Sequence, residues 1–94
     1  MAITFNIPGP LRQHTGGRSH VDVEPGAATV AEALAALWRE HPGLRDRILN
    51  ERGEVREHVN IFVGEENIRY CGGFAALVKN GADITLVPAV SGGL

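Results

Sequence analysis

The side chains of this 94-residue chain that could act as nucleophiles, bases or metal ligands are few and widely spaced. The histidines His14, His20, His41 and His58 include no pair at the i, i+4 spacing with which a helix presents two imidazoles to zinc. Cys71 is the single cysteine, which excludes an intrachain disulfide and any metal site that needs several thiolates from this chain. We therefore expect no catalytic residue and no metal site, and interpret Cys71 as a small packing residue.

The segment that suggests chemistry is the end of the chain, Val87-Pro88-Ala89-Val90-Ser91-Gly92-Gly93-Leu94. Small residues and two glycines follow a proline that ends a strand, so we expect residues 89–94 to form a thin, flexible tail. Residues without a Cβ let an extended backbone pass through a narrow channel of a partner enzyme and approach the α-phosphate of ATP. Val90, Ser91 and Gly92 would occupy that channel. A disordered terminus without a function is the alternative.

The composition is typical of one small globular domain. A hydrophobic share of 44% with only 5% aromatic residues predicts a core of Val, Ile, Leu and Ala. A formal charge of -2 argues against binding to nucleic acid, which needs a concentrated positive surface. No apolar stretch approaches the roughly 20 residues of a membrane-spanning helix. The N-terminus alternates like a strand and shows no secretory signal, so we expect a cytoplasmic protein without a membrane partner.

The first half of the chain predicts two strands and a helix. Ile3, Phe5 and Ile7 alternate with polar residues, as do Val21 and Val23, which indicates an opening hairpin across a polar connection. Thr29 and Glu32 have the spacing of a capping box, and an apolar stripe follows at helical steps. We expect a helix over Val30–His41, ended by Pro42-Gly43, that buries Leu34, Leu37 and Trp38.

The second half predicts a surface excursion and a second hairpin. Residues 42–57 are polar with few apolar anchors, which favours a short helical turn on the surface. A strand over Val59–Val63, a four-residue loop over Gly64–Asn67 and a short strand over Ile68–Tyr70 follow. The turn Asn80–Asp83 then leads into a last strand, Ile84–Val87.

Strand alternation also places one aromatic side chain on the surface. If Val59, Ile61 and Val63 face the helix, Asn60 and Phe62 point to the opposite, uncovered face of the sheet. We consider Phe62 a candidate partner contact.

The order strand, strand, helix, strand, short strand, strand indicates an α+β fold, a mixed sheet covered by one main helix. This order is similar to the β-grasp of ubiquitin. The similarity implies that the first and last strands lie side by side and that the C-terminus leaves the sheet edge. We assign residues 1–88 to the β-grasp domain and residues 89–94 to a flexible diglycine tail.

The last residues also carry a family resemblance. Val90-Ser91-Gly92-Gly93, after the strand ending at Pro88 and the Asn80–Asp83 turn, resembles the ending of the sulfur carriers related to the small subunit of molybdopterin synthase and the thiamine sulfur carrier. Three further segments resemble the carriers of thiocarboxylate-dependent cysteine synthesis: Arg12–Gly17, His58–Val63 and Ile68–Tyr70.

This resemblance implies a carrier and not an enzyme. An E1-like adenylyltransferase would activate the Gly93 carboxylate with ATP, and a sulfur donor would convert it to a thiocarboxylate. A cysteine synthase-like enzyme would then accept the sulfur. The carrier itself would bind no cofactor and would be a protein cosubstrate of its partners.

The chain departs from the family pattern at Leu94, which follows the glycine pair. While Leu94 is present, Gly93 has no free carboxylate. Either a processing metalloprotease cleaves between Gly93 and Leu94, or Leu94 is a residue added for expression.

Two other functions stay open. The chain could be the small subunit of molybdopterin synthase, or a ubiquitin-like conjugation or interaction module whose Gly93 is joined to a lysine. An electron-carrying β-grasp protein is excluded, because its two-iron cluster needs four thiolates.

Overall fold

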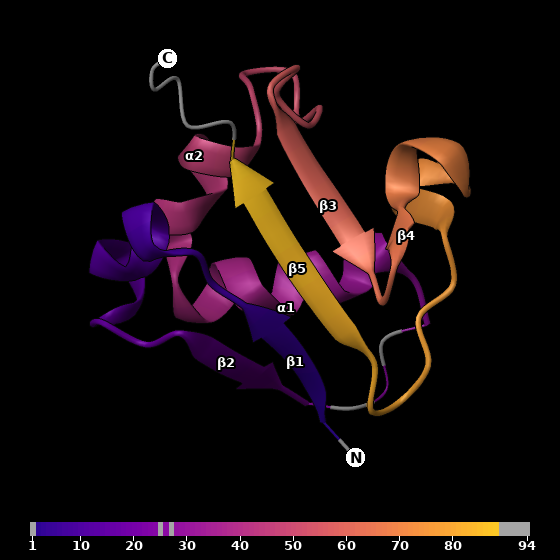
Figure 1. Cartoon of the computed structure of the whole chain (residues 1–94), viewed down its shortest axis with the longest axis horizontal. Coiled ribbons are helices and arrows are strands. Elements are labelled where there is room, and N and C mark those ends of the chain that lie inside the picture. The colour runs from indigo at the N-terminus through magenta and orange to yellow at the C-terminus, as the bar shows by residue number, and fades with distance from the viewer. Residues whose placement is uncertain (1, 25, 27, 89–94) are drawn as a thin grey trace.

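Five strands in the described part of the chain form one mixed sheet in the order β2-β1-β5-β3-β4 (Figure 1). The computed structural model describes residues 2–24, 26 and 28–88. The strands are β1 (Ile3–Asn6), β2 (His20–Val23), β3 (Val59–Val63), β4 (Glu66–Asn67) and β5 (Asp83–Pro88). β1 and β5 are parallel neighbours, and the other pairs are antiparallel. The prediction that the first and last strands lie side by side is therefore confirmed, as is the opening hairpin.

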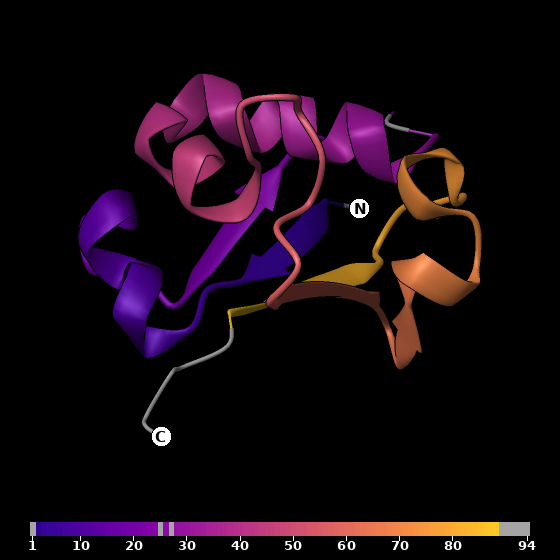
Figure 2. The same ribbon diagram turned by 90° about the horizontal axis from the view of Figure 1, so that it is seen from above.

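The main helix, α1 (Val30–Glu40), covers one face of the sheet (Figure 2). It begins at the predicted capping box: Thr29 Oγ1 accepts the N–H of Glu32 at 3.3 Å, and Glu32 Oε1 accepts the N–H of Thr29 at 3.1 Å. The helix ends one residue before the predicted boundary, with His41 as its C-cap. The reason is Pro42, because a residue that precedes proline avoids helical dihedrals, and His41 has φ -134° and ψ 69°.

Shorter helical segments connect these elements: η1 (Gly9–Thr15), η2 (Pro42–Leu44), α2 (Arg45–Ile48), η3 (Ile68–Tyr70) and η4 (Gly73–Ala75). α2 is the helical turn predicted within residues 42–57. η1 lies within the predicted polar connection, yet it buries Leu11 and Thr15. The Thr15 hydroxyl lies 2.9 Å from the carbonyl oxygen of Arg18, so this buried polar group has a partner. Among the described residues, no helix is long and apolar enough to cross a membrane.

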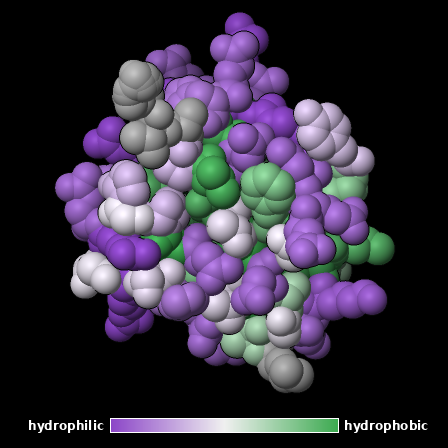
Figure 3. Space-filling view, in the orientation of Figure 1, coloured by the Kyte–Doolittle hydropathy of each residue, from purple (hydrophilic) through white to green (hydrophobic). Residues whose placement is uncertain are grey.

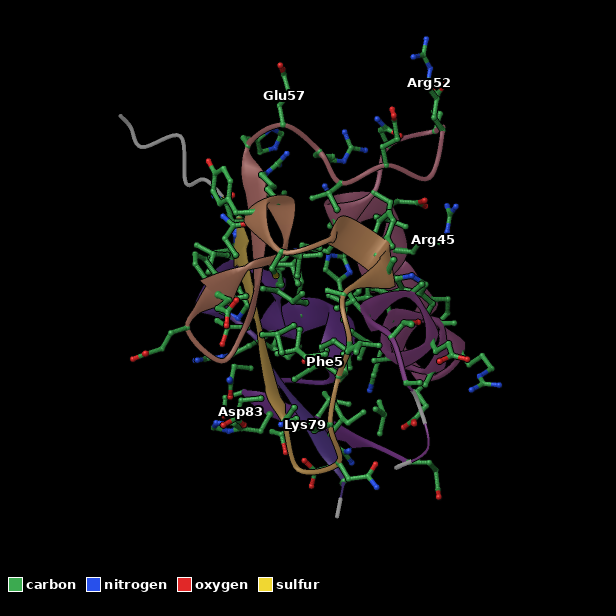
Figure 4. The ribbon with its side chains drawn as sticks, turned by 90° about the vertical axis from the view of Figure 1, so that its right-hand side faces the viewer. Phe5, Arg45, Arg52, Glu57, Lys79 and Asp83 are labelled. Atoms are coloured by element: carbon green, nitrogen blue, oxygen red, sulfur yellow. The ribbon has the colours of Figure 1, made fainter. Side chains whose placement is uncertain are left out.

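The core lies between the sheet and α1. Alternate strand residues such as Phe5, Ile61 and Leu86 point into it and are at most 1% exposed. Figure 4 shows Phe5 in the middle of the molecule, between the sheet and the helices. Leu34 and Leu37 of α1 are fully buried, whereas Trp38 is partly buried at the margin. The core is mainly aliphatic, as the composition predicts.

One predicted strand is wrong. Residues Ile68–Tyr70 form the 3-10 helix η3, and the short strand β4 lies earlier, at Glu66–Asn67. The predicted four-residue loop is correspondingly shorter, because Val63 already pairs with Glu66 across Gly64, which has φ 62°. The cause is the side chain of Asn67, which accepts the N–H of Arg69 at 3.0 Å. Such a side-chain bond turns the backbone out of the strand ladder.

Candidate functional site

The candidate site begins where β5 ends. Pro88 is the last residue of the strand, and it lies opposite Val59 at the start of β3. The predicted tail residues Val90, Ser91, Gly92, Gly93 and Leu94 lie outside the described residues. The expectation that the C-terminus leaves the sheet edge is wrong: β5 lies between β1 and β3, so the tail continues from the end of an interior strand (Figure 1).

The sheet face opposite α1 carries the predicted contact residue. Phe62 is half-buried, and the buried residues Val59 and Ile61 point to the helix side, so the predicted orientation of Phe62 is confirmed. Phe62 lies opposite Thr85, and Val87 lies opposite the neighbouring Asn60, which brings Phe62 and Val87 to adjacent positions on this face. Figure 3 shows apolar surface over β3 and β5 near the end of β5, within a largely polar surface.

Val87 was not among the predicted site residues, although the sequence contains the signal for it. Alternation within β5 buries Ile84 and Leu86, so Thr85 and Val87 must point to the open face. Val87 is 39% exposed, which is high for a large apolar residue in an interior strand. Phe62 and Val87 together form the apolar part of the open face; we call this pair the exit patch.

Polar side chains of the open face are paired with one another, next to the exit patch at Thr85 and at the opposite end of β5 at Thr4. Asn6 Nδ2 donates to Thr85 Oγ1 at 3.0 Å, and Thr4 Oγ1 donates to Asp22 Oδ1 at 2.7 Å. These bonds hold the side chains in fixed positions on the pleated surface. The open face is thus a pre-ordered polar surface with a small apolar centre, which is typical of protein interfaces.

A hollow of about 420 Å³ adjoins the end of β5 on the side of β1 and η1. Its lining includes Pro88, Val87, His20 and Arg12. Arg12 Nε donates to the carbonyl oxygen of Ile7 at 3.0 Å, which orients the guanidinium beside the strand end. Arg12 and His20 are the basic side chains among the described lining residues. The sequence analysis did not identify this hollow.

The remaining titratable residues do not form a site within the described part of the chain. No group of three His, Cys, Asp or Glu side chains there could hold a metal ion. Cys71 is partly buried against the core, and its Sγ lies 3.4 Å from the carbonyl oxygen of Asn67. This packing agrees with the interpretation of Cys71 as a small packing residue.

Comparison with known proteins identifies the family. The model of the ThiS family matches residues 5–93, which is nearly the whole chain. The chain belongs to the ThiS family. The match includes Gly93 and leaves Leu94 outside it.

Three relatives match between 88% and 99% of this chain. The sulfur carrier protein CysO of Mycobacterium tuberculosis is 34% identical over 95 residues, covering 99% of this chain and all of that protein. A chain of the BexX/CysO complex of Amycolatopsis orientalis has a TM-score of 0.87 and 39% identity, covering 98% of this chain and 100% of that one. Small archaeal modifier protein 1 of Haloferax volcanii is 38% identical over 84 residues, covering 88% of this chain and 91% of that protein. The ubiquitin-like β-grasp fold is shared with these structures.

Proposed function

We propose that this chain is a sulfur carrier protein that delivers sulfur as a thiocarboxylate on Gly93. The observation that carries this function is the similarity to sulfur carrier CysO, which extends over 99% of the chain. The family match through Gly93 supports that residue as the functional terminus. The destination we favour is the synthesis of cysteine or another sulfur metabolite.

The chemistry takes place on the terminal carboxylate. An oxygen of the Gly93 carboxylate attacks the α-phosphorus of ATP on an E1-like adenylyltransferase, and pyrophosphate leaves. A hydrosulfide ion supplied by a sulfur donor then attacks the acyl carbon, forms the C–S bond, displaces AMP and loses its proton. The resulting thiocarboxylate is a soft nucleophile that a cysteine synthase-like partner can use. The chain is thus a protein cosubstrate, and the partner enzyme binds the ATP.

The described surface and the tail have separate roles in this scheme. The exit patch of Phe62 and Val87 docks a partner beside the point from which the tail continues. Val90, Ser91 and Gly92 then span the partner's channel to its reaction centre. The complex of CysO with BexX supports docking on a partner protein, since a CysO chain of that complex shares this fold. We place the exchange in the cytoplasm, where such ATP-dependent enzymes operate.

Leu94 must be absent before Gly93 can be charged. Hydrolysis of the Gly93–Leu94 peptide bond by a processing metalloprotease would release leucine and expose the Gly93 carboxylate.

Intact mass of the untagged protein from its native host, under conditions that preserve thiocarboxylates, tests the proposed function. We expect a species that ends at Gly93 with one oxygen replaced by sulfur. A variant lacking Gly92-Gly93 should remain folded by circular dichroism and never carry sulfur. A population that keeps Leu94 throughout, without a sulfur-bearing form under sulfur demand, would overturn the proposal.

A second candidate function is conjugation to other proteins. It is favoured by the 38% identity to small archaeal modifier protein 1, whose name describes a modifier of proteins. The product would be an isopeptide bond between Gly93 and a lysine of a target. The same mass measurement separates the two functions, because conjugation adds the whole chain to a target and carriage adds sulfur to Gly93.

A further inference from the structure

Arg69 lies in η3, and its guanidinium forms hydrogen bonds with the backbone at the start of β3. Its Nη2 donates to three backbone carbonyl oxygens, those of Val59 at 2.7 Å, Arg56 at 2.9 Å and Glu57 at 3.2 Å. The Glu57 side chain points away from the molecule, so only its backbone takes part in these contacts (Figure 4). The three acceptors lie within four residues of one another, just before and at the start of β3. Arg69 therefore holds this part of the backbone in place, and we call these bonds the clamp.

The clamp takes the place of a neighbouring strand at the upstream end of β3. Among the described residues, β4 pairs with β3 at Phe62 and Val63, and not at the upstream end of β3. Backbone carbonyls at that upstream edge need other donors. A guanidinium offers several N–H groups in one rigid plane, so one side chain satisfies several carbonyls and fixes their relative positions.

The same side chain also fixes the first side chain of the open face. Arg69 Nε donates to Asn60 Oδ1 at 3.2 Å, and Asn67 Nδ2 donates to the same oxygen at 3.0 Å. Asn67 Oδ1 in turn accepts the N–H of Arg69 at 3.0 Å. Asn60, Asn67 and Arg69 therefore form a closed ring of hydrogen bonds; we call it the Arg69 ring.

The strand register connects this ring to the tail. Arg69 bonds to two residues of β3 itself, Val59 and Asn60. They lie opposite Pro88 and Val87, the last two residues of β5. The backbone groups of Val59 point away from β5, because its N–H donates to the carbonyl oxygen of Arg56 at 2.9 Å and its carbonyl oxygen accepts from Arg69. Asn60 and Val87 are therefore the last hydrogen-bonded pair of the β3–β5 ladder. The position of the end of β5 then depends on how firmly the start of β3 is held.

We propose that Arg69 is a positioning residue for the reaction at Gly93. By holding the start of β3, it fixes the end of β5, from which the chain continues to Gly93, and so raises the rate at which an activating enzyme adenylates Gly93. This role rests on the proposed function. Among the described residues, the side-chain hydrogen bonds of Arg69 reach Asn60 and the carbonyls of residues 56, 57 and 59 and not the exit patch, so its effect on the reaction passes through β3 and β5.

The test compares Arg69→Gln with a matched control, Arg56→Gln. Arg56 also donates from Nε and Nη2 to a backbone carbonyl, that of Asp46, at 3.1 and 2.8 Å, but it holds the loop to α2 and not β3 to β5. Pyrophosphate release is measured against carrier concentration, with ATP and a purified E1-like adenylyltransferase that charges the wild-type chain ending at Gly93.

We expect Arg69→Gln to lower kcat by about 10- to 100-fold with a smaller rise in KM, because small misplacement of a reacting group costs rate, whereas the side chains of the exit patch are unchanged. Arg56→Gln should match the wild-type chain in both constants. Arg69→Lys should recover part of kcat, since an ammonium can replace the Nη2 bonds to the carbonyls but not the Nε bond to Asn60.

Each outcome is informative. A wild-type chain ending at Gly93 that no such enzyme charges contradicts the proposed function itself. A charged wild-type chain with equal kcat for Arg69→Gln and Arg56→Gln overturns the positioning role. If Arg69→Gln does not fold, Arg69→Lys takes its place: it loses the Nε bond to Asn60 and the planar donor set, so its kcat should lie below that of the wild-type chain, and a wild-type kcat overturns the role as well.

Discussion

At the scale of single residues, Phe62 and Val87 are the apolar side chains of the exit patch. We expect Phe62→Ala to raise KM for the activating enzyme about tenfold, which corresponds to about 1.4 kcal/mol, with kcat unchanged. An aromatic contact near the centre of an interface contributes mainly to binding. Thr4→Ala, on the same face but in β1, where Thr4 lies opposite Asp83 at the start of β5 and away from the exit patch, is the control and should leave KM unchanged. Equal constants for the two variants would exclude Phe62 from the docking surface.

Cys71, in contrast to Phe62, is a residue whose replacement should not affect function. Its side chain packs against the core, and its Sγ contacts the carbonyl oxygen of Asn67. A serine hydroxyl can keep that contact at nearly the same volume, so Cys71→Ser should change the free energy of unfolding by less than about 1 kcal/mol. Sulfur loading, followed by intact mass, should be unchanged. Complete loss of loading in a variant that unfolds at the wild-type denaturant concentration would instead assign Cys71 a chemical role.

At the scale of elements, α1 depends on the capping box at its N-terminus. Thr29→Ala removes the hydroxyl that accepts the N–H of Glu32, and should cost about 1 kcal/mol. For a domain of this size, this lowers Tm by about 4–8 °C. Glu32→Gln is the control, because glutamine keeps the reciprocal bond to the N-cap N–H. Thermal unfolding by circular dichroism measures both, and equal midpoints would show that the box contributes nothing.

At the scale of the whole molecule, the sheet and its core are built from residues 3–88 in the part of the chain that the structure describes. The division into a domain of residues 1–88 and a tail of residues 89–94 then predicts that truncation after Pro88 changes the free energy of unfolding by less than about 0.5 kcal/mol. Leu37→Ala, at a fully buried position, should cost about 2–5 kcal/mol in the same denaturant titration. A truncation as costly as Leu37→Ala would make the tail part of the folded domain.

The sequence by itself determined the features that depend on near neighbours in the chain. Period-two alternation identified β1, β3 and β5 and the buried side of each, and the Thr29–Glu32 spacing identified the start of α1. The glycine pair after Pro88 directed attention to the end of the chain. These signals are readable because side-chain period and capping are local properties of the backbone.

The tertiary structure decided what depends on residues far apart in the sequence. Residues 4 and 83 are neighbours through the β1–β5 pairing, and Phe62 and Val87 become one patch through the β3–β5 register. The alternating run Ile68–Tyr70 predicts a strand, but the Asn67 side chain and the bonds of Arg69 across to β3 hold it as a 3-10 helix. Periodicity states which way a side chain points; it does not state which distant backbone group that side chain will meet, because that depends on how the elements pack.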